Sequence, residues 1–545
     1  MSLWDYAVGG GDLWAVVMKK NVYFMIALVL LGSFLFLFGL GNMALTDPDE
    51  TFYAETAKEM VEAKDWSTPL IFGKPQFEKP IFYYWLVMLS YLVFGIGEFA
   101  ARFPSAIFGI FGVIGVYLLG RAIFSPLAGF LSAIILATCV QYLVLARACV
   151  TDMVLTVFIL FCVLFFVKGQ ITGRRRYYFI AAVMAALAVL TKGPIGAFIP
   201  GVIFLSYITI SGGWKNIKKI PILWCLAIFF AIALPWYLTA MRLHGTQLVN
   251  EFFAFHNVTR FLKPEHKIGS SPFFYIPVVL GGFFPWTFFL IFGAWDMFKD
   301  KNIASRLKAS RGLLLTWFLV VFVFFSVSRT KLVTYIFPLF PVMALVTGRF
   351  WEKFITEFGD KALTAKMKVS FVLSGISVLA AGIAVCLVVG HKYSQILTGT
   401  LVASGIFILG ILISTILLFR GKRIASFVLI VLSVVLLSFP LILRILPPVG
   451  EFESSRALSY KLNELAAPED PVAGECDHRR GIAFYTGRTD IVDVHPYSGL
   501  LTFFSRKEKV WGIVQYKHYK QMQELKGDSA PDPLFRVGKY VLVTN

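Results

Sequence analysis

Long apolar runs, repeated along most of the chain, constrain the fold more than any other feature of this sequence. Stretches of spanning length begin near residues 22, 103, 126, 153, 177, 194, 220, 273, 312, 332, 369, 398 and 424. A helix needs about 20 mostly apolar residues to cross the hydrocarbon core of a bilayer. Only 15% of the 545 residues are charged, against about 25% in soluble domains. The sequence therefore predicts an α-helical polytopic membrane protein with about thirteen transmembrane helices.

The charge of the loops decides the placement of one ambiguous apolar run, Ile81–Phe94, which is too short for a comfortable span. If this run lies in the interface without crossing, the other basic loops share a side with Lys19 and Lys20, as the positive-inside rule requires. If it is an ordinary span, which is the alternative, those loops face the side opposite to Lys19. We therefore expect a cytoplasmic N-terminus and a C-terminal tail outside. The basic loops lie near residues 174–176, 215–219, 299–311, 353–368 and 420–423.

A change of composition beyond about Pro447 divides the chain into two predicted domains. Residues 1–446 form the transmembrane domain, whose first outer loop covers residues 41–80 and whose interfacial helix covers residues 81–94. Residues 447–545 are predicted to form a small α/β domain that faces outward. Its expected elements are a short amphipathic helix at Glu453–Leu465 and strands at Ile482–Tyr485, Ile491–Val494 and Tyr540–Val543.

The net charge of +19 does not indicate a nucleic-acid partner, because the Lys and Arg residues lie in short loops between apolar runs. The six cysteines have neither a disulfide pattern nor zinc-site spacing. His256 and His266 are not spaced as metal ligands either. We expect no metal and no cofactor, with a divalent metal left open.

Charged residues that are not explained as cytoplasmic anchors gather on the predicted outer face. Asp47, Asp49 and Glu50 directly follow the first span. A plain helix start, with Asp47 as N-cap and Pro48 at the first helical position, is the structural alternative. Lys79 precedes the interfacial helix, where it can hold a phosphate or simply snorkel.

Four further charged residues lie at predicted outer turns. Asp152 opens a span, where it could be an N-cap, and Lys192 lies in a tight break between two spans, where it could be an interfacial anchor. Arg329 and Lys331 occupy a short outer turn and oppose the positive-inside trend. Charges near the membrane are costly unless they are paired or wet, so such a group predicts a functional site.

Five stretches recur in consistent order from about residue 41 to residue 340: Asp49–Glu55, Gly73–Pro80, Ala101–Ser105, Leu190–Gly193 and Phe325–Tyr335. Together they resemble a known family, the aminoarabinose transferases of lipid A, which are related to the protein O-mannosyltransferases. The resemblance implies a GT-C-type glycosyltransferase that takes a sugar from a polyprenyl phosphate carrier, such as undecaprenyl phosphate, and inverts its anomeric centre. It further implies a lipid A or lipopolysaccharide-type acceptor and an active site at the periplasmic face of a bacterial inner membrane.

This chemistry assigns expected roles to the outer-face residues. A leaving phosphate needs cations, and an electron-poor sugar centre is stabilised by nearby carboxylates. Asp49 is the expected base or acceptor-orienting carboxylate, and we expect a monomer whose partners are the donor lipid, the acceptor and membrane lipids. The expected catalytic residues are Asp49, Glu78 and Asp152; the donor phosphate-binding residues are Lys79, Lys192, Arg329 and Lys331; the sugar and acceptor pocket is Glu50, Tyr53, Glu55, His256, Arg260 and Tyr335.

Two alternatives remain at this stage. A protein O-glycosyltransferase would use the same kind of donor, and a lipid or sugar transporter would place its charges nearer the bilayer midplane. The chain also departs from the family at Phe52, where the family usually has an Arg that is thought to help hold the carrier phosphate. The sequence fixes neither the sugar nor the acceptor.

Overall fold

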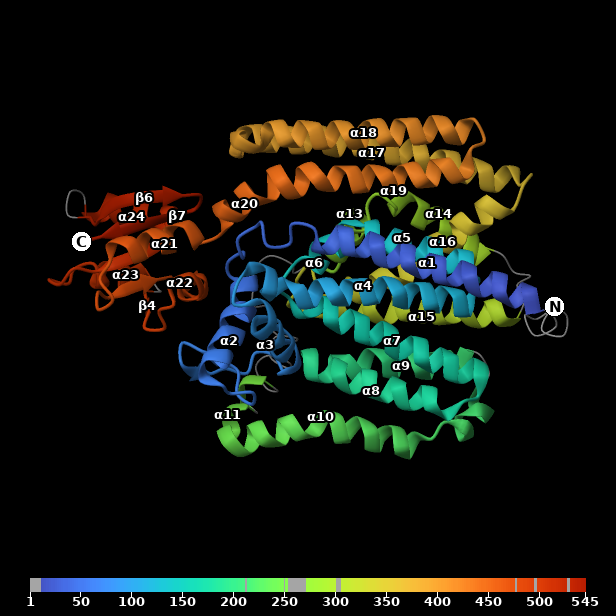
Figure 1. The fold of residues 1–545 in the computed structure, drawn as a ribbon, viewed down its shortest axis with the longest axis horizontal. Helices are drawn as coiled ribbons and strands as arrows, with labels where there is room; N and C mark the ends of the chain where they lie inside the picture. The colour runs from blue at the N-terminus through green and yellow to red at the C-terminus, as the bar shows by residue number, and fades with distance from the viewer. Residues whose placement is uncertain are drawn as a thin grey trace.

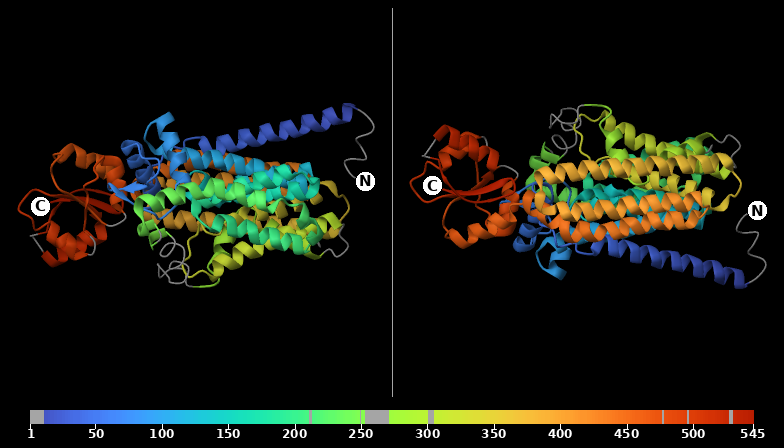
Figure 2. Two further views of the ribbon diagram at one scale, coloured as in Figure 1. Left: turned by 90° about the horizontal axis from the view of Figure 1, so that it is seen from below. Right: turned by 90° about the horizontal axis from the view of Figure 1, so that it is seen from above.

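A long bundle of helices carries a small α/β domain at one end (Figures 1 and 2). The computed structural model describes residues 11–210, 213–248, 250–252, 271–299, 305–475, 478–494, 497–526 and 530–545. Helix α1 begins at the end of the bundle that lies opposite the C-terminal domain (Figure 1). The two ends of the bundle therefore differ: one carries the first loop and the C-terminal domain, and the other carries the start of the chain.

The bundle is built from helices that correspond to the apolar runs of the sequence. Short 3₁₀ turns at Gly213–Lys219 (η1), Phe337–Leu339 (η3) and Ser394–Ile396 (η4) and a π turn at Leu441–Ile445 (η5) join or extend some of them. The helices are α1 (Gly11–Leu37), α2 (Asp49–Ala63), α3 (Phe82–Phe94), α4 (Glu98–Ile123), α5 (Pro126–Thr138), α6 (Val140–Ala146), α7 (Thr151–Thr172), α8 (Arg175–Lys192), α9 (Ile195–Ile210), α10 (Ile222–His244), α11 (Thr246–Leu248), α13 (Tyr275–Gly282), α14 (Thr287–Lys299), α15 (Ser305–Val327), α16 (Phe340–Thr356), α17 (Lys361–Lys392), α18 (Leu397–Phe419) and α19 (Arg423–Pro440).

The predicted membrane-helical fold is confirmed. Among the described residues, seven helices are long and apolar enough to cross a membrane, or up to nine if each of two bent pairs is one span. The bent pairs are α5 with α6, at 69°, and α13 with α14, at 106°. Each of the thirteen predicted runs contains a helix, but several are short, so the count of thirteen spans stays a prediction.

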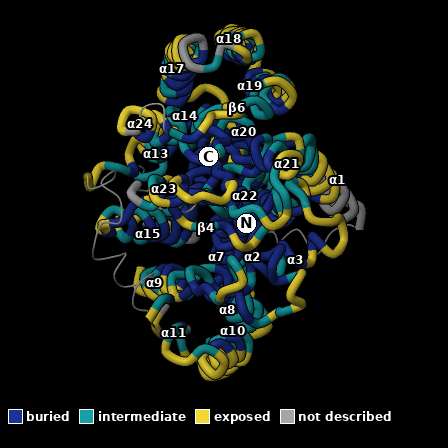
Figure 3. The backbone as a smooth tube through the Cα atoms, turned by 90° about the vertical axis from the view of Figure 1, so that its left-hand side faces the viewer, coloured by how far each residue is buried: buried dark blue, intermediate teal, exposed yellow. Residues whose placement is uncertain are grey.

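Helices α4 and α7 form the centre of the bundle. In their most apolar windows, 61% of α4 and 72% of α7 is buried, against 11% of α10 and 17% of α17 at the periphery (Figure 3). Small residues permit the closest packing in the centre. A Cβ atom on Gly120 would lie 2.6 Å from the Cα atom of Gly129, so α4 and α5 approach each other where both lack side chains.

The first loop folds over the end of the bundle as a small layer of its own. It contains α2, the strands β1 (Leu70–Ile71) and β2 (Lys74–Pro75), which pair antiparallel, and the apolar helix α3. Helix α3 contacts α2 and α4 and lies at the end that carries the C-terminal domain (Figure 1). This placement supports the prediction that the run Ile81–Phe94 does not cross the membrane.

The C-terminal α/β domain is present, as predicted. Its sheet has the order β4-β3-β5-β7-β6, with β3 parallel to β4 and β5, and β7 antiparallel to β5 and β6. Its elements are α20 (Leu446–Glu453), α21 (Arg456–Leu465), β3 (Val472–Gly474), α22 (Arg479–Thr486), β4 (Val492–Asp493), α23 (Tyr497–Phe503), β5 (Trp511–Gln515), α24 (Tyr516–Lys526), β6 (Asp532–Val537) and β7 (Tyr540–Thr544).

One predicted strand of this domain is wrong. Residues Ile482–Tyr485 lie in α22, which ends at Gly487 in a left-handed conformation with φ 76°. A short apolar run is ambiguous between strand and helix, and packing decides the outcome. Helix α22 packs against α2 and α21, and this contact buries all four apolar residues. The strands predicted near Ile491 and Tyr540 are present as β4 and β7.

The C-terminal domain is docked on the first loop by buried hydrogen bonds. The Lys58 ammonium donates to the carbonyl oxygens of Ala483 (3.0 Å) and Phe484 (3.2 Å). The backbone N–H of Leu45 donates to the Tyr485 hydroxyl at 2.8 Å. These contacts join segments more than 400 residues apart in the sequence, and they hold α22 against α2.

Candidate functional site

Two helix ends bring a carboxylate and an ammonium group together under the first loop. Asp152 lies in the first turn of α7, where the helix dipole favours a negative charge, and Lys192 is the last residue of α8, where it favours a positive one. The Lys192 Nζ atom lies 2.5 Å from Asp152 Oδ1, and both side chains are almost buried. Helix α7 begins without a side-chain cap, so the N-cap alternative for Asp152 does not apply.

An aromatic ring lies beside this ion pair. The Lys192 ammonium lies 4.7 Å from the centre of the Tyr335 ring. Tyr275 donates its hydroxyl to the Leu332 carbonyl oxygen at 3.2 Å, which ties α13 to the turn that carries Tyr335. The pair therefore faces rings that offer flat apolar surfaces and hydroxyl groups, as a sugar-binding pocket requires.

Tyr53 of α2 links this pair to the first loop. Its ring centre lies 5.3 Å from that of Tyr83 and 6.1 Å from that of Tyr84, both on α3. Burial raises the pKa of the Tyr53 hydroxyl, and the negative charges of Asp152 and Glu78 raise it further. Two of the three predicted catalytic carboxylates, Asp152 and Glu78, are therefore close enough to act on one buried phenol.

The predicted residues Glu78 and Lys79 lie in the extended segment before α3. The Glu78 carboxylate accepts a hydrogen bond from Arg480 Nη2 at 3.4 Å, and Lys79 Nζ donates to the Glu78 carbonyl oxygen at 3.2 Å. Both are half-buried. Gln76 donates from Nε2 to the Tyr84 hydroxyl at 2.9 Å, and its Oε1 accepts from the Glu78 N–H at 3.0 Å, which fixes this segment.

Glu50, which was predicted to lie in the sugar and acceptor pocket, is held by buried hydrogen bonds. Its carboxylate accepts two hydrogen bonds from Arg102, at Nε and Nη2, both 2.7 Å long. It also accepts from the backbone N–H of Cys149 and from the N–H and hydroxyl of Thr46. With five donors around two buried oxygens, Glu50 fixes the start of the first loop to α4.

The structural alternative for Asp47 is also wrong in detail. Helix α2 begins at Asp49, and Pro48 occupies the N-cap position without a side-chain hydrogen bond. Buried Asp47 instead accepts from the Thr51 hydroxyl and from the Ser455 N–H, both at 2.9 Å. Burial raises the pKa of Asp47 to about 6. Asp49 is exposed at the start of α2.

Glu55, which was expected in the acceptor pocket, is buried between α2 and α22. Its Oε2 lies 3.3 Å from Lys58 Nζ, and its Oε1 has no hydrogen-bond partner among the described residues. Burial raises the pKa of this carboxyl to about 8, although Lys58 acts in the opposite direction. Its position indicates a role in the contact between the first loop and the C-terminal domain.

The two cations of the basic turn after α15 differ in exposure. Arg329 is exposed, whereas Lys331 is buried and donates to the Ser328 carbonyl oxygen at 2.5 Å within the same turn. Predicted residues His256 and Arg260 lie outside the described residues. The structure therefore brings together Asp152, Lys192 and Tyr335, with Tyr53 near Asp152 and Glu78. It places Glu50, Glu55 and Lys331 in other contacts.

Two arginines that the sequence-based assignment left out are tied to this region. Arg102 could have been found, because a charge inside an apolar helix is costly unless it is paired. Arg480 gave no such signal, because it lies in a polar tail 402 positions from its partner Glu78. Among the described residues, no group of three or more His, Cys, Asp or Glu side chains could hold a metal ion.

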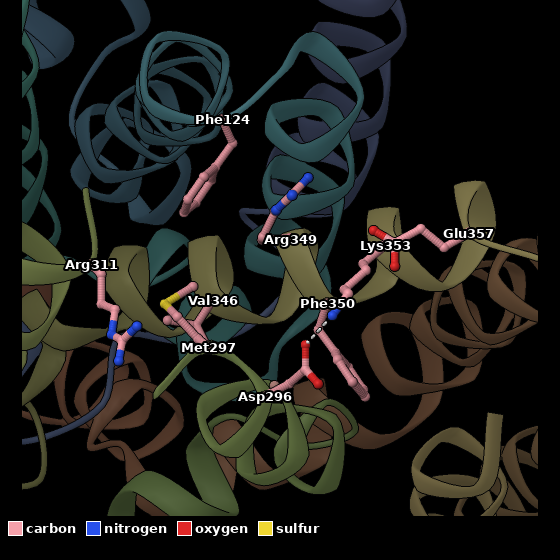
Figure 4. Close-up of a pocket in the computed structure, with 10 residues that line it drawn as sticks. Phe124, Asp296, Met297, Arg311, Val346, Arg349, Phe350, Lys353 and Glu357 are labelled. Carbon is pink, nitrogen blue, oxygen red and sulfur yellow. Dashed lines mark hydrogen bonds and ion pairs between the residues drawn. The ribbon is translucent and has the colours of Figure 1, made fainter. Parts of the chain in front are cut away.

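A separate cavity lies at the other end of the bundle and differs in kind (Figure 4). It has a volume of about 160 Å³, and its charged lining belongs to α14, α15 and α16. Asp296 accepts from Lys353 at 3.0 Å and from Lys366 at 2.7 Å, so its carboxylate joins three helices. No tyrosine is among the residues that line this cavity. It is therefore not the candidate site.

Sequence comparisons connect the chain to sugar-transferring proteins. A family model described as dolichyl-phosphate-mannose-protein mannosyltransferase matches residues 78–238. An uncharacterized protein of Aquifex aeolicus is 29% identical over 61% of this chain and 64% of its own length. An undecaprenyl phosphate-alpha-4-amino-4-deoxy-L-arabinose arabinosyl transferase of Proteus mirabilis is 28% identical over 67% of this chain and 66% of its own. The chain thus spans just under two thirds of the length of these relatives.

Solved structures extend the likeness to both domains. ArnT from Cupriavidus metallidurans, bound to undecaprenyl phosphate, matches with a TM-score of 0.79 and 22% identity over 98% of both chains. The chain has the GT-C fold. The archaeal oligosaccharyltransferase AglB from Archaeoglobus fulgidus is more distant, with a TM-score of 0.51 and 13% identity over 92% of this chain and 71% of its own. The resemblance to the aminoarabinose transferases therefore holds at the level of sequence and of fold.

Proposed function

We propose that this protein is an inverting glycosyltransferase that moves a sugar from a polyprenyl phosphate carrier to a lipid A-type acceptor at the periplasmic face of a bacterial inner membrane. The observation that carries the proposal is the buried Asp152–Lys192 pair, 2.5 Å apart, beside Tyr53 and Tyr335 at the end of a membrane bundle. The fold shared with ArnT, which was solved with undecaprenyl phosphate, supports a lipid phosphate as the donor.

The proposed reaction breaks the bond between the anomeric carbon and the phosphate oxygen and forms a new bond from that carbon to the acceptor oxygen. The phosphate leaves with the electron pair, and Lys79 and Lys192 stabilise its charge, assisted by Arg329. Asp152 orients Lys192. If the acceptor is a hydroxyl, Asp49 accepts its proton; an ionised phosphate acceptor needs no base.

The proposed orientation has a direct test in thiol labelling. Thr172 is the last residue of α7, at the opposite end of that helix from Asp152, and Ser505 lies in the C-terminal domain; both are exposed. In a Cys476→Ser background, Thr172→Cys and Ser505→Cys should label from opposite sides, with Ser505→Cys reached by an impermeant reagent in the periplasm. Labelling of both from one side would remove the single-face site.

The proposed activity is tested by mass spectrometry of lipid A and envelope glycans from cells with and without this protein. A sugar that appears on lipid A only with the active protein supports the proposal. The match to the protein mannosyltransferase model at residues 78–238 favours one second candidate, a protein O-glycosyltransferase. A sugar on envelope proteins and none on lipid A would select that candidate, and no change in either would contradict both.

The assignment of Lys79 to the donor is tested by kinetics. Lys79→Ala should nearly eliminate use of the carrier-linked sugar and raise its KM, because the leaving phosphate loses a cation. Lys74→Ala is the matched control, since Lys74 is exposed on β2 in the same loop. An unchanged donor KM in Lys79→Ala would exclude Lys79 from the phosphate site.

A further inference from the structure

We infer that the C-terminal domain completes the substrate site and that Arg480 of α22 binds a lipid-borne phosphate there. The inference deepens the proposed function and rests on it. The observation that starts it is a stack between the two domains: the Arg480 guanidinium lies 4.5 Å from the centre of the Phe52 ring on α2. The same guanidinium reaches the Glu78 carboxylate, at 3.4 Å, directly beside Lys79.

The position of Arg480 is set by the docking of its helix. Lys58 donates to two carbonyl oxygens of α22, and the Tyr485 hydroxyl on the same helix accepts from the Leu45 N–H. Gly481, the next residue, meets Asp47 so closely that a Cβ atom there would lie 2.1 Å from Asp47 Oδ1. Helix α22 cannot move away from α2 without breaking these contacts, so Arg480 is a fixed part of the first-loop surface.

The neighbours of Arg480 connect it to the candidate site. The side chain is 17% exposed, so part of it is accessible from solvent. Its charge acts on the hydroxyl of Tyr84, whose ring packs 6.1 Å from that of Tyr53. The negative charge of Asp152 in turn raises the pKa of the Tyr53 hydroxyl. A continuous path of charged and aromatic groups therefore runs from the C-terminal domain to the Asp152–Lys192 pair.

The chemistry of a guanidinium suits a phosphate better than it suits its present partner. A planar guanidinium binds two phosphate oxygens at once, and stacking on an aromatic face pre-orients it. The contact with Glu78 is long for a charged pair, 3.4 Å, where about 2.8 Å is usual. Glu78 thus neutralises Arg480 in the absence of substrate, and an arriving phosphate with two negative oxygens is the stronger partner.

Phe52 explains why this cation comes from the other domain. The Phe52 side chain is 4% exposed and packs edge-on against Tyr53 and Tyr84, at 5.1 and 6.4 Å between ring centres. Its place on α2 therefore provides an aromatic face rather than a charge. Arg480 covers that face, so the first loop and α22 together present one guanidinium beside Glu78.

The test measures binding of undecaprenyl phosphate and, separately, of lipid A to the purified full-length chain in detergent. Arg480→Gln should weaken binding of at least one lipid about tenfold or more. Arg480→Lys should bind with an affinity between those of wild type and Arg480→Gln. Arg479→Gln removes the same charge from the same helix, but Arg479 pairs with Asp493 at 3.1 Å, so binding should stay within about twofold of wild type. Which lipid loses affinity tells whether Arg480 holds the carrier phosphate or the acceptor phosphate.

The outcomes separate this inference from the proposed function. Wild-type binding that Arg480→Gln leaves unchanged for both lipids overturns the inference alone, whereas wild-type protein that binds neither lipid overturns both. Loss of binding counts only if the thermal unfolding midpoint of the variant matches wild type. As a second variant, the swap Phe52→Arg with Arg480→Phe keeps one ring and one guanidinium in contact. This double variant should bind the lipid more tightly than Arg480→Gln does. Phe52→Arg alone should destabilise the chain, because it places a second cation against Arg480.

Discussion

Two largely buried ion pairs lie at the same end of the bundle, and the groups that surround them differ. Between Glu50 and Arg102 the contact is bidentate. The guanidinium also donates to backbone carbonyl oxygens, and the Glu50 carboxylate also accepts from the backbone N–H of Cys149. Between Asp152 and Lys192 the contact is a single short one, and the ammonium also faces the Tyr335 ring. The first pair is saturated by protein groups, and the second lies beside an aromatic ring.

The difference supports separate roles for the two pairs, the first in anchoring the loop and the second in the proposed reaction. Burial pushes the pKa of Glu50 upward, but the Arg102 guanidinium outweighs it and holds that pKa below its usual range. A carboxylate fixed in this way cannot respond to a substrate. A single lysine contact can be exchanged for a phosphate, because an ammonium has three donors that rotate freely. The comparison predicts that loss of the first pair unfolds the loop and that loss of the second stops the reaction.

The largest expected effect is the loss of Arg102. Arg102→Met leaves Glu50 charged, buried and without its main partner, which typically costs about 3–5 kcal/mol. Three carbonyl oxygens, those of Leu40, Met43 and Ala44, also lose their donor. We expect a large fall in the thermal unfolding midpoint in detergent, with activity lost alongside it. Arg121→Met, in the exposed last turn of the same helix, is the control; equal stability of the two variants would contradict the anchoring role.

The second prediction concerns the other pair. Asp152→Asn retains an oxygen that accepts from Lys192, so the unfolding midpoint should change little. The negative charge that orients Lys192 is lost, and removal of one electrostatic contact at a reacting centre costs about 10²–10³ in kcat. Steady-state transfer rates at saturating donor check this. A variant that folds and turns over at nearly the wild-type rate would place Asp152 with Glu50 among the structural residues.

The helical fold could be predicted because apolar runs and loop charge report directly on a bilayer. Ile81–Phe94 was placed correctly as a helix, and its position at the end of the bundle fits the charge-based orientation. The strand predicted at Ile482–Tyr485 failed because four apolar residues fit either structure, and the surface of α2 that selects the helix is more than 400 residues away. Local pattern cannot contain that information.

The site could be predicted only where local charge near a membrane was itself informative. Asp152 and Lys192 each lie at the end of an apolar helix, and the structure places them in contact. Glu50 and Glu55 carried the same signal, but their partners Arg102 and Lys58 turn them into structural groups. Arg480 was invisible because its significance comes entirely from docking of the C-terminal domain. The charged residues near the membrane thus indicated where the candidate site lies. Only the residues paired with them in the structure distinguish proposed anchors from proposed reactive groups.

A third prediction uses pH at the joint between the first loop and the C-terminal domain. Burial raises the pKa of Asp47 from 3.8 to about 6, so the folded chain keeps a proton that the unfolded chain releases. The unfolding free energy therefore falls as pH rises from about 4 to about 6 and stays lower above that, by on the order of 3 kcal/mol. Asp47→Asn cannot titrate and should flatten this part of the profile.

The measurement for Asp47 is the unfolding midpoint of the full chain at pH 5 and at pH 7.5. Wild type should lose more stability between these values than Asp47→Asn does. Asp490→Asn, a change at an exposed position of the C-terminal domain, should leave the wild-type difference intact. Identical pH profiles for wild type and Asp47→Asn would mean that Asp47 does not hold a proton in the folded chain.

The smallest effect is expected at the far end of the bundle, where Asp296 binds both Lys353 and Lys366. Lys366→Met leaves Asp296 paired with Lys353, and the side chains here are about one-fifth exposed, so solvent screens the loss. Such pairs are worth about 0–1 kcal/mol. We expect a slightly lower unfolding midpoint and unchanged donor KM and kcat, because the group lies at the end of the bundle opposite the C-terminal domain (Figures 1 and 4). A fall in kcat without a fall in stability would show that the two ends are coupled through the bundle, and the separation of anchoring from chemistry would then fail as a rule for this fold.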